Sequence, residues 1–270
     1  MLRHPRLLCA ILAAVLTAAA ATPGQTSESW PGIHAEAFGA RAIQDGTGIV
    51  KLTAPYRPDD VRSVPLTADI TLSDGRTIRS VSFVVDENPS PVAAVFTLGE
   101  DRNRAHITTN IRLDQQSDVR VVVEASDGAL YMAEQLVKFA GGQASCSAPP
   151  VGDPDEIVAN MGKMILTPVG AAPNGSRQTA HAHYELNHPN HTGMVLDQIT
   201  LHYVPLLMVS RIEARQGDAL VFEMQGSITL AQNPVVEFDY VTNGTNEIVV
   251  TAEDTSGTTW TQRFPIGPAG

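Results

Sequence analysis

Cysteine is scarce in this chain, which has only Cys9 and Cys146 among its 270 residues. Cys9 lies in a leading apolar stretch that we expect to be removed, so Cys146 is the one thiol expected in the mature protein. This count excludes a disulfide framework of the kind that supports small secreted domains, and it excludes a zinc site built from several cysteines. The fold must therefore depend on core packing.

Basic residues are also few, with 18 Lys and Arg against 29 Asp and Glu, which gives a net charge of −11. Loss of a leader that contains Arg3 and Arg6 but no acid would move this charge to −13. Such a balance disfavours nucleic acid and anionic lipid as partners. The acidic residues are scattered along the chain, which is typical of a solubilising surface.

Common catalytic and cofactor motifs are missing. The chain has no Gly-x-Ser-x-Gly elbow, phosphate-binding loop, dinucleotide fingerprint or Cys-x-x-Cys-His haem motif. Paired carboxylates such as Asp59-Asp60 lie in polar turns, where solvation is the default. We therefore expect no self-contained active site, no resident cofactor and a protein that is not itself an enzyme.

The first 21 residues are arranged like a secretory signal peptide. Arg3 and Arg6 precede an apolar run from Leu7 to Leu16, and small residues follow up to Ala21. The run is shorter than the about 20 apolar residues that span a bilayer. We expect export, cleavage near Ala21 and no membrane attachment of the mature chain.

The remaining sequence predicts an all-β fold of two tandem immunoglobulin-like β-sandwich domains after a short N-terminal helix. Trp30, Ile33 and Phe38 have helical spacing. From residue 48 to 139, short runs rich in Val, Ile and Thr are separated by turn sequences, and a second such series begins near residue 163. One run of the second series, residues 194–204, is expected to be a strand like the others. We predict domains at 28–140 and 156–267.

Residues 141–155 form a linker by composition, because Gly, Ser, Ala, Pro and Asp leave almost nothing to bury. Cys146 lies within it between two serines, so we expect an exposed thiol on a flexible arm, with Gly141 and Gly142 supplying the flexibility. No basic residue lies near Cys146 in sequence, so the thiol is not expected to be strongly activated. An accessible thiol of this kind favours a carrier, on which other proteins act. A structural cysteine and an intermolecular disulfide are the alternatives.

Histidines are dense between residues 181 and 191. In a strand His181 and His183 would point to one face, and His188 lies in an expected turn. Solvent-facing histidines are the favoured interpretation, because no set of further ligands has a spacing specific enough to name a metal. The weaker alternative is copper binding by Cys146 together with these histidines or with Met161 or Met164.

Both halves resemble subunits of the sulfur-oxidation carrier SoxYZ. "GIVKLTAPYRPDDVRSVPL" and "VKFAGGQASCSAP" are similar to SoxY, in which two glycines precede the carrier cysteine near the end of the chain. "NHPNHTGMV", "GDALVFEMQGSITLAQNPVVEFDY" and "AEDTSGTTW" are similar to SoxZ. The sequence departs from SoxY where residues 143–145 separate the glycines from Cys146 and where Ser-Ala-Pro-Pro follows. The arm is therefore tethered at both ends and reaches less far than a free tail.

The resemblance implies two sandwiches packed on one another, with a sulfur adduct carried on Cys146 in the periplasm for sulfur-oxidation enzymes. Fused chains of this kind look most like the quinoprotein dehydrogenase-associated SoxYZ-like carriers. The main alternative is therefore an accessory protein that docks on a periplasmic pyrroloquinoline-quinone (PQQ) dehydrogenase.

Overall fold

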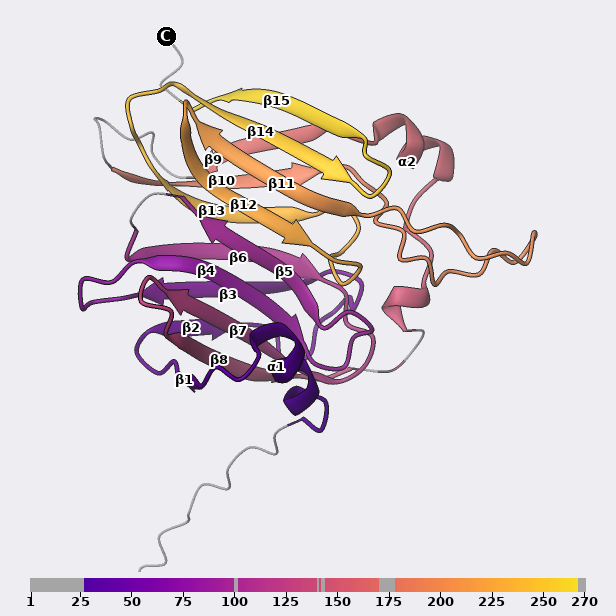
Figure 1. Ribbon diagram of the computed structural model, residues 1–270. Coiled ribbons are helices and arrows are strands. Elements are labelled where there is room, and N and C mark those ends of the chain that lie inside the picture. Colours follow the sequence, from indigo (N-terminus) through magenta and orange to yellow (C-terminus); the bar gives the residue numbers. More distant parts are fainter. Residues whose placement is uncertain (1–26, 100–101, 140, 142–143, 170–177, 267–270) are drawn as a thin grey trace, which may run out of the picture.

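The computed structural model describes residues 27–99, 102–139, 141, 144–169 and 178–266. The expected signal peptide, residues 1–21, lies outside the described residues. No helix in the described part of the chain has the length and apolar character needed to cross a membrane. The predicted all-β class and the short N-terminal helix are confirmed (Figure 1).

The N-terminal half contains one helix and eight strands within the described residues: α1 (Trp30–Phe38), β1 (Ile43–Asp45), β2 (Val50–Thr53), β3 (Val64–Thr71), β4 (Ile78–Val85), β5 (Val92–Leu98), β6 (Arg104–Ile111), β7 (Ser117–Ala125) and β8 (Leu130–Val137). A 3-10 turn, η1 (Ser145–Ser147), and α2 (Pro154–Asn160) follow. The C-terminal half contains β9 (Met164–Val169), β10 (Thr179–Leu186), β11 (Val209–Gln216), β12 (Ala219–Gly226), β13 (Val235–Val241), β14 (Glu247–Asp254) and β15 (Thr259–Pro265).

Each half is a β-sandwich, and the two sandwiches are joined edge to edge. One sheet has the strand order β1-β8-β7-β4-β5-β12-β11-β14-β15, and the other has the order β2-β3-β6-β13-β10-β9. The join is made by the antiparallel pairs β5–β12 and β6–β13. Both sheets therefore run continuously through the molecule (Figure 1). This arrangement refines the expectation of two sandwiches packed on one another, because the contact uses strand edges and not sheet faces.

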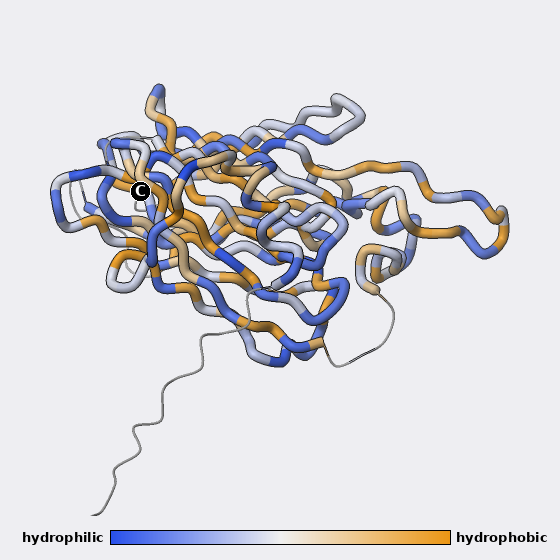
Figure 2. The backbone as a smooth tube through the Cα atoms, turned by 60° about the horizontal axis from the view of Figure 1, so that its bottom comes forward, coloured by the Kyte–Doolittle hydropathy of each residue, from blue (hydrophilic) through white to orange (hydrophobic). Residues whose placement is uncertain are grey.

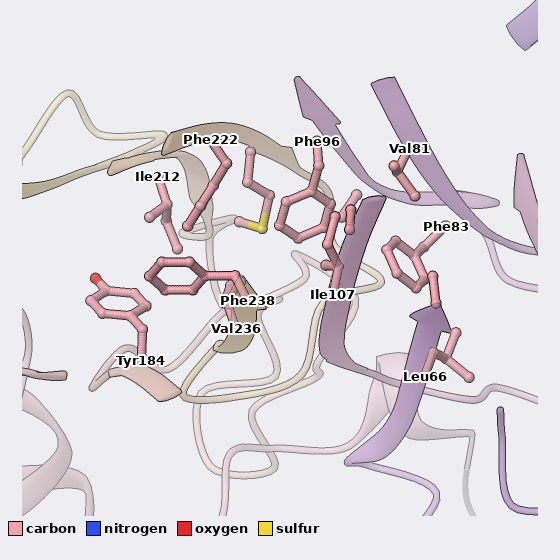
Figure 3. Close-up of a cluster of buried hydrophobic side chains, with 14 of the residues drawn as sticks. Leu66, Val81, Phe83, Phe96, Ile107, Tyr184, Ile212, Phe222, Val236 and Phe238 are labelled. Carbon is pink, nitrogen blue, oxygen red and sulfur yellow. The ribbon is translucent and has the colours of Figure 1, made fainter. Parts of the chain in front are cut away.

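The core also crosses the join. Phe96 of β5 contacts Phe222 of β12 at a ring-centroid distance of 5.7 Å, and Phe222 contacts Phe238 of β13 at 4.9 Å (Figure 3). All three side chains are buried. One hydrophobic cluster contains residues of both halves. Because the two halves share this cluster, we expect them to unfold together.

Replacing Phe222 with Ala should lower the free energy of unfolding by about 3–5 kcal/mol, because it removes the ring that joins the two halves of the core. Urea unfolding can be followed by tryptophan fluorescence in single-tryptophan variants, since Trp30 reports on one half and Trp260 on the other. Coincident transitions are expected before and after the substitution, and the exposed change Val169→Ala serves as control. Two separate transitions in the wild-type protein would contradict a shared core.

The helix α1 covers the outer face of the nine-stranded sheet. Trp30, Ile33 and Phe38 pack on Val84, Val122 and Leu130, which belong to β4, β7 and β8. Under the helix, Arg120 of β7 is fully buried, with its guanidinium carbon 4.2 Å from the centre of the Trp30 ring. A charged side chain thus supports the helix from below.

Two segments differ from the sequence-based expectation. Residues 194–204, predicted as a strand, instead form most of a hairpin that leaves the sheets. They contain its first arm, its turn and the start of its second arm, and the isolated bridges His191–Leu207 and Leu196–Tyr203 hold the two arms together. The reason is that β10 already has β9 and β13 as neighbours, so no sheet edge is open beside it. The linker at 141–155 was expected to lack structure, but it contains η1 and the start of α2. The side chain of Asp153 caps α2 by accepting from the amides of Asp155 and Glu156.

Candidate functional site

Cys146 is enclosed by the protein. Its residue lies in the middle of η1, has 0% exposure and forms no disulfide. The expectation of an exposed thiol on a flexible arm is therefore wrong for this conformation. Of the two glycines expected to supply flexibility, Gly141 is exposed with a φ of 95°, and Gly142 lies outside the described residues.

The physical reason for the burial is a pair of hydrogen bonds that hold the main chain of Cys146 from two sides. Its amide donates to Oδ1 of Asp114 at 2.7 Å, and its carbonyl accepts from Oγ1 of Thr192 at 2.5 Å. Asp114 belongs to the N-terminal half and Thr192 to the C-terminal half. We call Arg112, Asp114, Cys146 and Thr192 the cysteine seat.

Asp114 is positioned by the loop that follows β6. The amide of Leu113 donates to the carbonyl of Val61 at 2.7 Å, and the amide of Asp114 donates to Oδ1 of Asn88 at 3.0 Å. The amide nitrogen of the buried Asn88 side chain donates in turn to the carbonyl of Arg112 at 2.7 Å. These contacts fix the loop and so hold the carboxylate of Asp114 beside the amide of Cys146.

Thr192 is positioned by the turn that follows β10. The buried Asn190 adopts a positive φ of 48°, donates to the carbonyl of Ala231 at 2.7 Å and accepts from the amide of Val209 at 2.9 Å. The hydroxyl oxygen of Thr192 accepts from the amide of Met194 at 3.1 Å, which leaves its proton for the carbonyl of Cys146. Asp114 and Thr192 are thus each held by hydrogen bonds to neighbouring segments of the fold.

Arg112 places a buried positive charge beside the thiol. Its guanidinium donates to the carbonyls of Pro189, Ile228 and Leu230 at 3.4, 3.2 and 3.0 Å, all in the C-terminal half. Burial lowers the pKa of Arg112, while the nearby groups of Cys146 and Asp114 oppose that shift. The seat therefore forms only when the two halves are joined.

The environment keeps the thiol neutral. Burial raises the pKa of Cys146 to about 12, and the negative charge and hydrogen bond of Asp114 act in the same direction. The nearby positive charge of Arg112 opposes the rise in pKa without cancelling it. Since the thiolate is the reactive form of cysteine, the seated thiol is a poor nucleophile. Because the residue is fully buried in a close-packed interior, a larger group on its sulfur would require the seat to open.

The histidines considered as metal ligands do not converge on one point. His181 and His183 point to the same outer face of β10, as expected. Nδ1 of His181 lies 2.5 Å from Asp239, and Nδ1 of His183 lies 2.9 Å from Glu237. His188 is buried elsewhere. Within the described residues, no group of three or more His, Cys, Asp or Glu side chains could hold a metal ion.

Three residues of the seat were missed by sequence reasoning. Thr192 lies in the segment "NHPNHTGMV", whose similarity to SoxZ is a signal in the sequence but assigns no role to this threonine. Arg112 and Asp114 lie in "IRLDQQS", where nothing local distinguishes them from surface charges. Their importance depends on contacts between distant parts of the chain.

Comparison with known proteins divides the chain into two parts. Residues 34–143 match the family model described as sulfur oxidation protein SoxY, and residues 171–265 match that described as sulphur oxidation protein SoxZ. Cys146 lies between the two matches. Among solved structures, the sulfur carrier protein SoxY from Chlorobium limicola f thiosulfatophilum is 27% identical, with a TM-score of 0.35, and the match covers 41% of this chain and 94% of that chain. The search of curated proteins found no match.

Proposed function

Because the chain carries SoxY and SoxZ family-model domains in tandem, we propose that it is a periplasmic sulfur carrier that holds a covalent adduct on Cys146 for partner enzymes. The observation that best supports the proposal is the position of Cys146, which both halves hold at their junction. Export through residues 1–21 is part of the proposal, and the carrier itself performs no chemistry on its cargo.

In this proposal the segment that carries Cys146 has two positions, one in the cysteine seat and one released from it. In the seated position the thiol is neutral and enclosed, so unloaded carrier is protected from side reactions. In the released position the segment around Cys146 leaves Asp114 and Thr192 and presents the sulfur to an enzyme. Loading with thiosulfate joins the sulfur of Cys146 to the outer sulfur of thiosulfate. The thiol proton and two electrons are released. An electron-accepting redox enzyme must take those electrons, since the seat contains no oxidant.

Intact-mass measurement of the protein purified from its native compartment tests the function. We expect a fraction of molecules to carry an added sulfur atom or thiosulfate group that dithiothreitol removes. The Cys146→Ser variant should carry none and should lose function completely. Finding only the free thiol in the wild type, together with full function of Cys146→Ser, would contradict the carrier.

An accessory role on a periplasmic PQQ dehydrogenase is the second candidate. The burial of Cys146 also fits this role, because a protein that only docks on an enzyme does not need a reactive thiol. In that case both the wild type and Cys146→Ser should co-purify with the dehydrogenase under gentle conditions. A carrier would instead show function that depends on the thiol.

A further inference from the structure

Exposed apolar side chains gather on the two segments that flank the cysteine seat. Residues 194–207 form the hairpin that extends away from the sheets, and we call it the finger (Figure 1). Figure 2 shows hydrophobic stretches along it. The other segment runs from residue 151 through α2. Together they contain seven of the large hydrophobic residues that are exposed in the described part of the chain: Val151, Val158, Leu196, Ile199, Leu201, Tyr203 and Leu206.

The tip of the finger is built to keep its apolar side chains in solvent. Oδ1 of Asp197 accepts from the amides of Ile199 and Thr200 at 2.9 and 2.7 Å, which closes the turn. Ile199 is 93% exposed. Leu201 has a φ of 56°, a conformation that costs a residue with a branched side chain about 1–2 kcal/mol, and its side chain is also exposed. Strain that holds a large apolar side chain outward indicates a binding role.

The finger is continuous with the seat. Thr192, which holds the carbonyl of Cys146, lies two residues before the finger begins, and the amide of Leu207 at the end of the finger donates to the carbonyl of His191 at 3.0 Å. On the other side of Cys146, Val151 is tied to Gln232 by two hydrogen bonds of 2.7 and 2.9 Å. The base of the finger is therefore joined directly to the segment that carries the thiol.

The charged side chains along these two segments are mostly acidic, and the one cation between residues 151 and 163 is Lys163, whose ammonium group donates to Oδ1 of Asn160 at 2.6 Å. The sequence from 187 to 210 has no Lys or Arg, and Asp197 lies at the finger tip. Asp153, Asp155 and Glu156 are exposed at the start of α2. A second copy of the chain would bring the same acidic groups to the contact and would be repelled. A partner with an apolar groove and basic residues at its rim is complementary to both the apolar and the charged parts.

We propose that the finger and α2 form the docking surface for the enzyme that loads or unloads Cys146, and that this enzyme has an apolar groove edged by Lys and Arg. This proposal rests on the carrier function. Docking moves the chain at Thr192, which loosens the hydrogen bond to Cys146 and opens the seat where the enzyme lies. The thiol is thereby presented only to a protein that has docked.

Photo-cross-linking in the native organism tests the surface. Benzoyl-phenylalanine is placed at Ile199 in the full chain, with Ile165 of β9, which is 53% exposed, as the matched control position. We expect Ile199 to capture one enzyme that Ile165 does not capture and that, once purified, loads or unloads Cys146. Capture of a second copy of this chain only, or equal capture at both positions, would overturn the proposal.

The captured enzyme is then purified and titrated with the carrier. Ile199→Glu should weaken binding at least ten-fold, because it removes the apolar side chain that the partner's groove would bury and places a carboxylate there instead. Ile199→Leu should bind like the wild type. Binding should also weaken as salt is raised. Because the side chain is exposed, circular dichroism should show both variants folded. Unchanged binding of Ile199→Glu would overturn the docking surface.

The two proposals can fail separately. If Ile199→Glu still acquires the adduct on Cys146 at the wild-type rate, the docking surface is wrong and the carrier function remains. If the enzyme binds through the finger but Cys146 never carries an adduct, the carrier function is wrong and the protein docks for another purpose.

Discussion

Iodoacetamide at pH 8 is expected to label Cys146 in the native protein about a hundred times more slowly than in the urea-unfolded chain. The seated thiol is enclosed, so labelling must pass through an open seat. Opening breaks the hydrogen bonds to Asp114 and Thr192, which together with lost burial costs about 3 kcal/mol, or about a hundred-fold in population. The measurement uses a Cys9→Ser background, so that Cys146 is the single thiol.

The pH dependence of this labelling follows from the raised pKa. A thiol in the unfolded chain ionises near pH 8.5, whereas the pKa of the seated thiol is about 12. The seat stabilises the neutral thiol fully below about pH 8.5, and this stabilisation is lost as the pH rises from there towards 12. Labelling of the unfolded chain should therefore level off above about pH 8.5, while labelling of the native protein should continue to rise.

Variants of Asp114 and Thr192 distinguish the effect of the hydrogen bonds to Cys146 from the effect of the negative charge beside it. Thr192→Val removes the donor to the carbonyl of Cys146 at nearly constant shape, and should speed labelling about five- to thirty-fold. Asp114→Asn keeps an oxygen for the amide of Cys146 but removes the negative charge, so it should lower the pKa of the seated thiol. Thr200→Val, at the exposed finger tip, is the control. Equal labelling rates in the native and unfolded wild type would rule out the seat.

Replacing Arg120 with Met should lower the free energy of unfolding by about 3–5 kcal/mol. Arg120 and Asp86 are paired with no solvent exposure of either side chain, and the guanidinium donates to both carboxylate oxygens at 2.8–3.0 Å. Removing the cation leaves the carboxylate of Asp86 buried without a counter-charge, which is the costly case. Arg120 also supports Trp30, so the packing of α1 should loosen as well.

A double variant provides the control for this prediction. In Arg120→Met/Asp86→Leu no buried charge of the pair remains, and we expect much of the lost stability to return. Urea unfolding followed by circular dichroism measures all three proteins. A loss below about 1 kcal/mol in the single variant would mean that water reaches the pair and that the helix does not depend on it.

Much of the fold could be predicted because the strands alternate between buried and exposed positions. In β14, Ile248, Val250 and Ala252 face the core while the residues between them are only partly buried, and this period of two is visible in the sequence. The join between the halves could not be predicted, because nothing in β5 or β12 alone says which strand edge it will meet. Side-by-side pairing of distant strands depends on the whole core.

The cysteine seat was missed for a related reason. Composition around Cys146 predicts a linker, and local sequence contains no apolar residue that would bury it. Its burial comes from Asp114 and Thr192, which lie 32 and 46 residues away in the chain. The helix α2 was easier to predict from the sequence, because Asp153 followed by Pro154 and two acidic residues is a recognised helix start. The Gly, Ser and Pro content of the surrounding residues outweighed that local signal.

Joining the two sandwiches in a single polypeptide also changes how the seat is assembled. As separate subunits, the halves would meet by diffusion and could exchange partners at low abundance. In one chain each half experiences the other at an effective concentration that does not fall on dilution, of millimolar order for a short tether. The stoichiometry is fixed at one to one, and Cys146 always meets the Thr192 of its own molecule. Dilution of the protein therefore leaves the seated form of Cys146 intact.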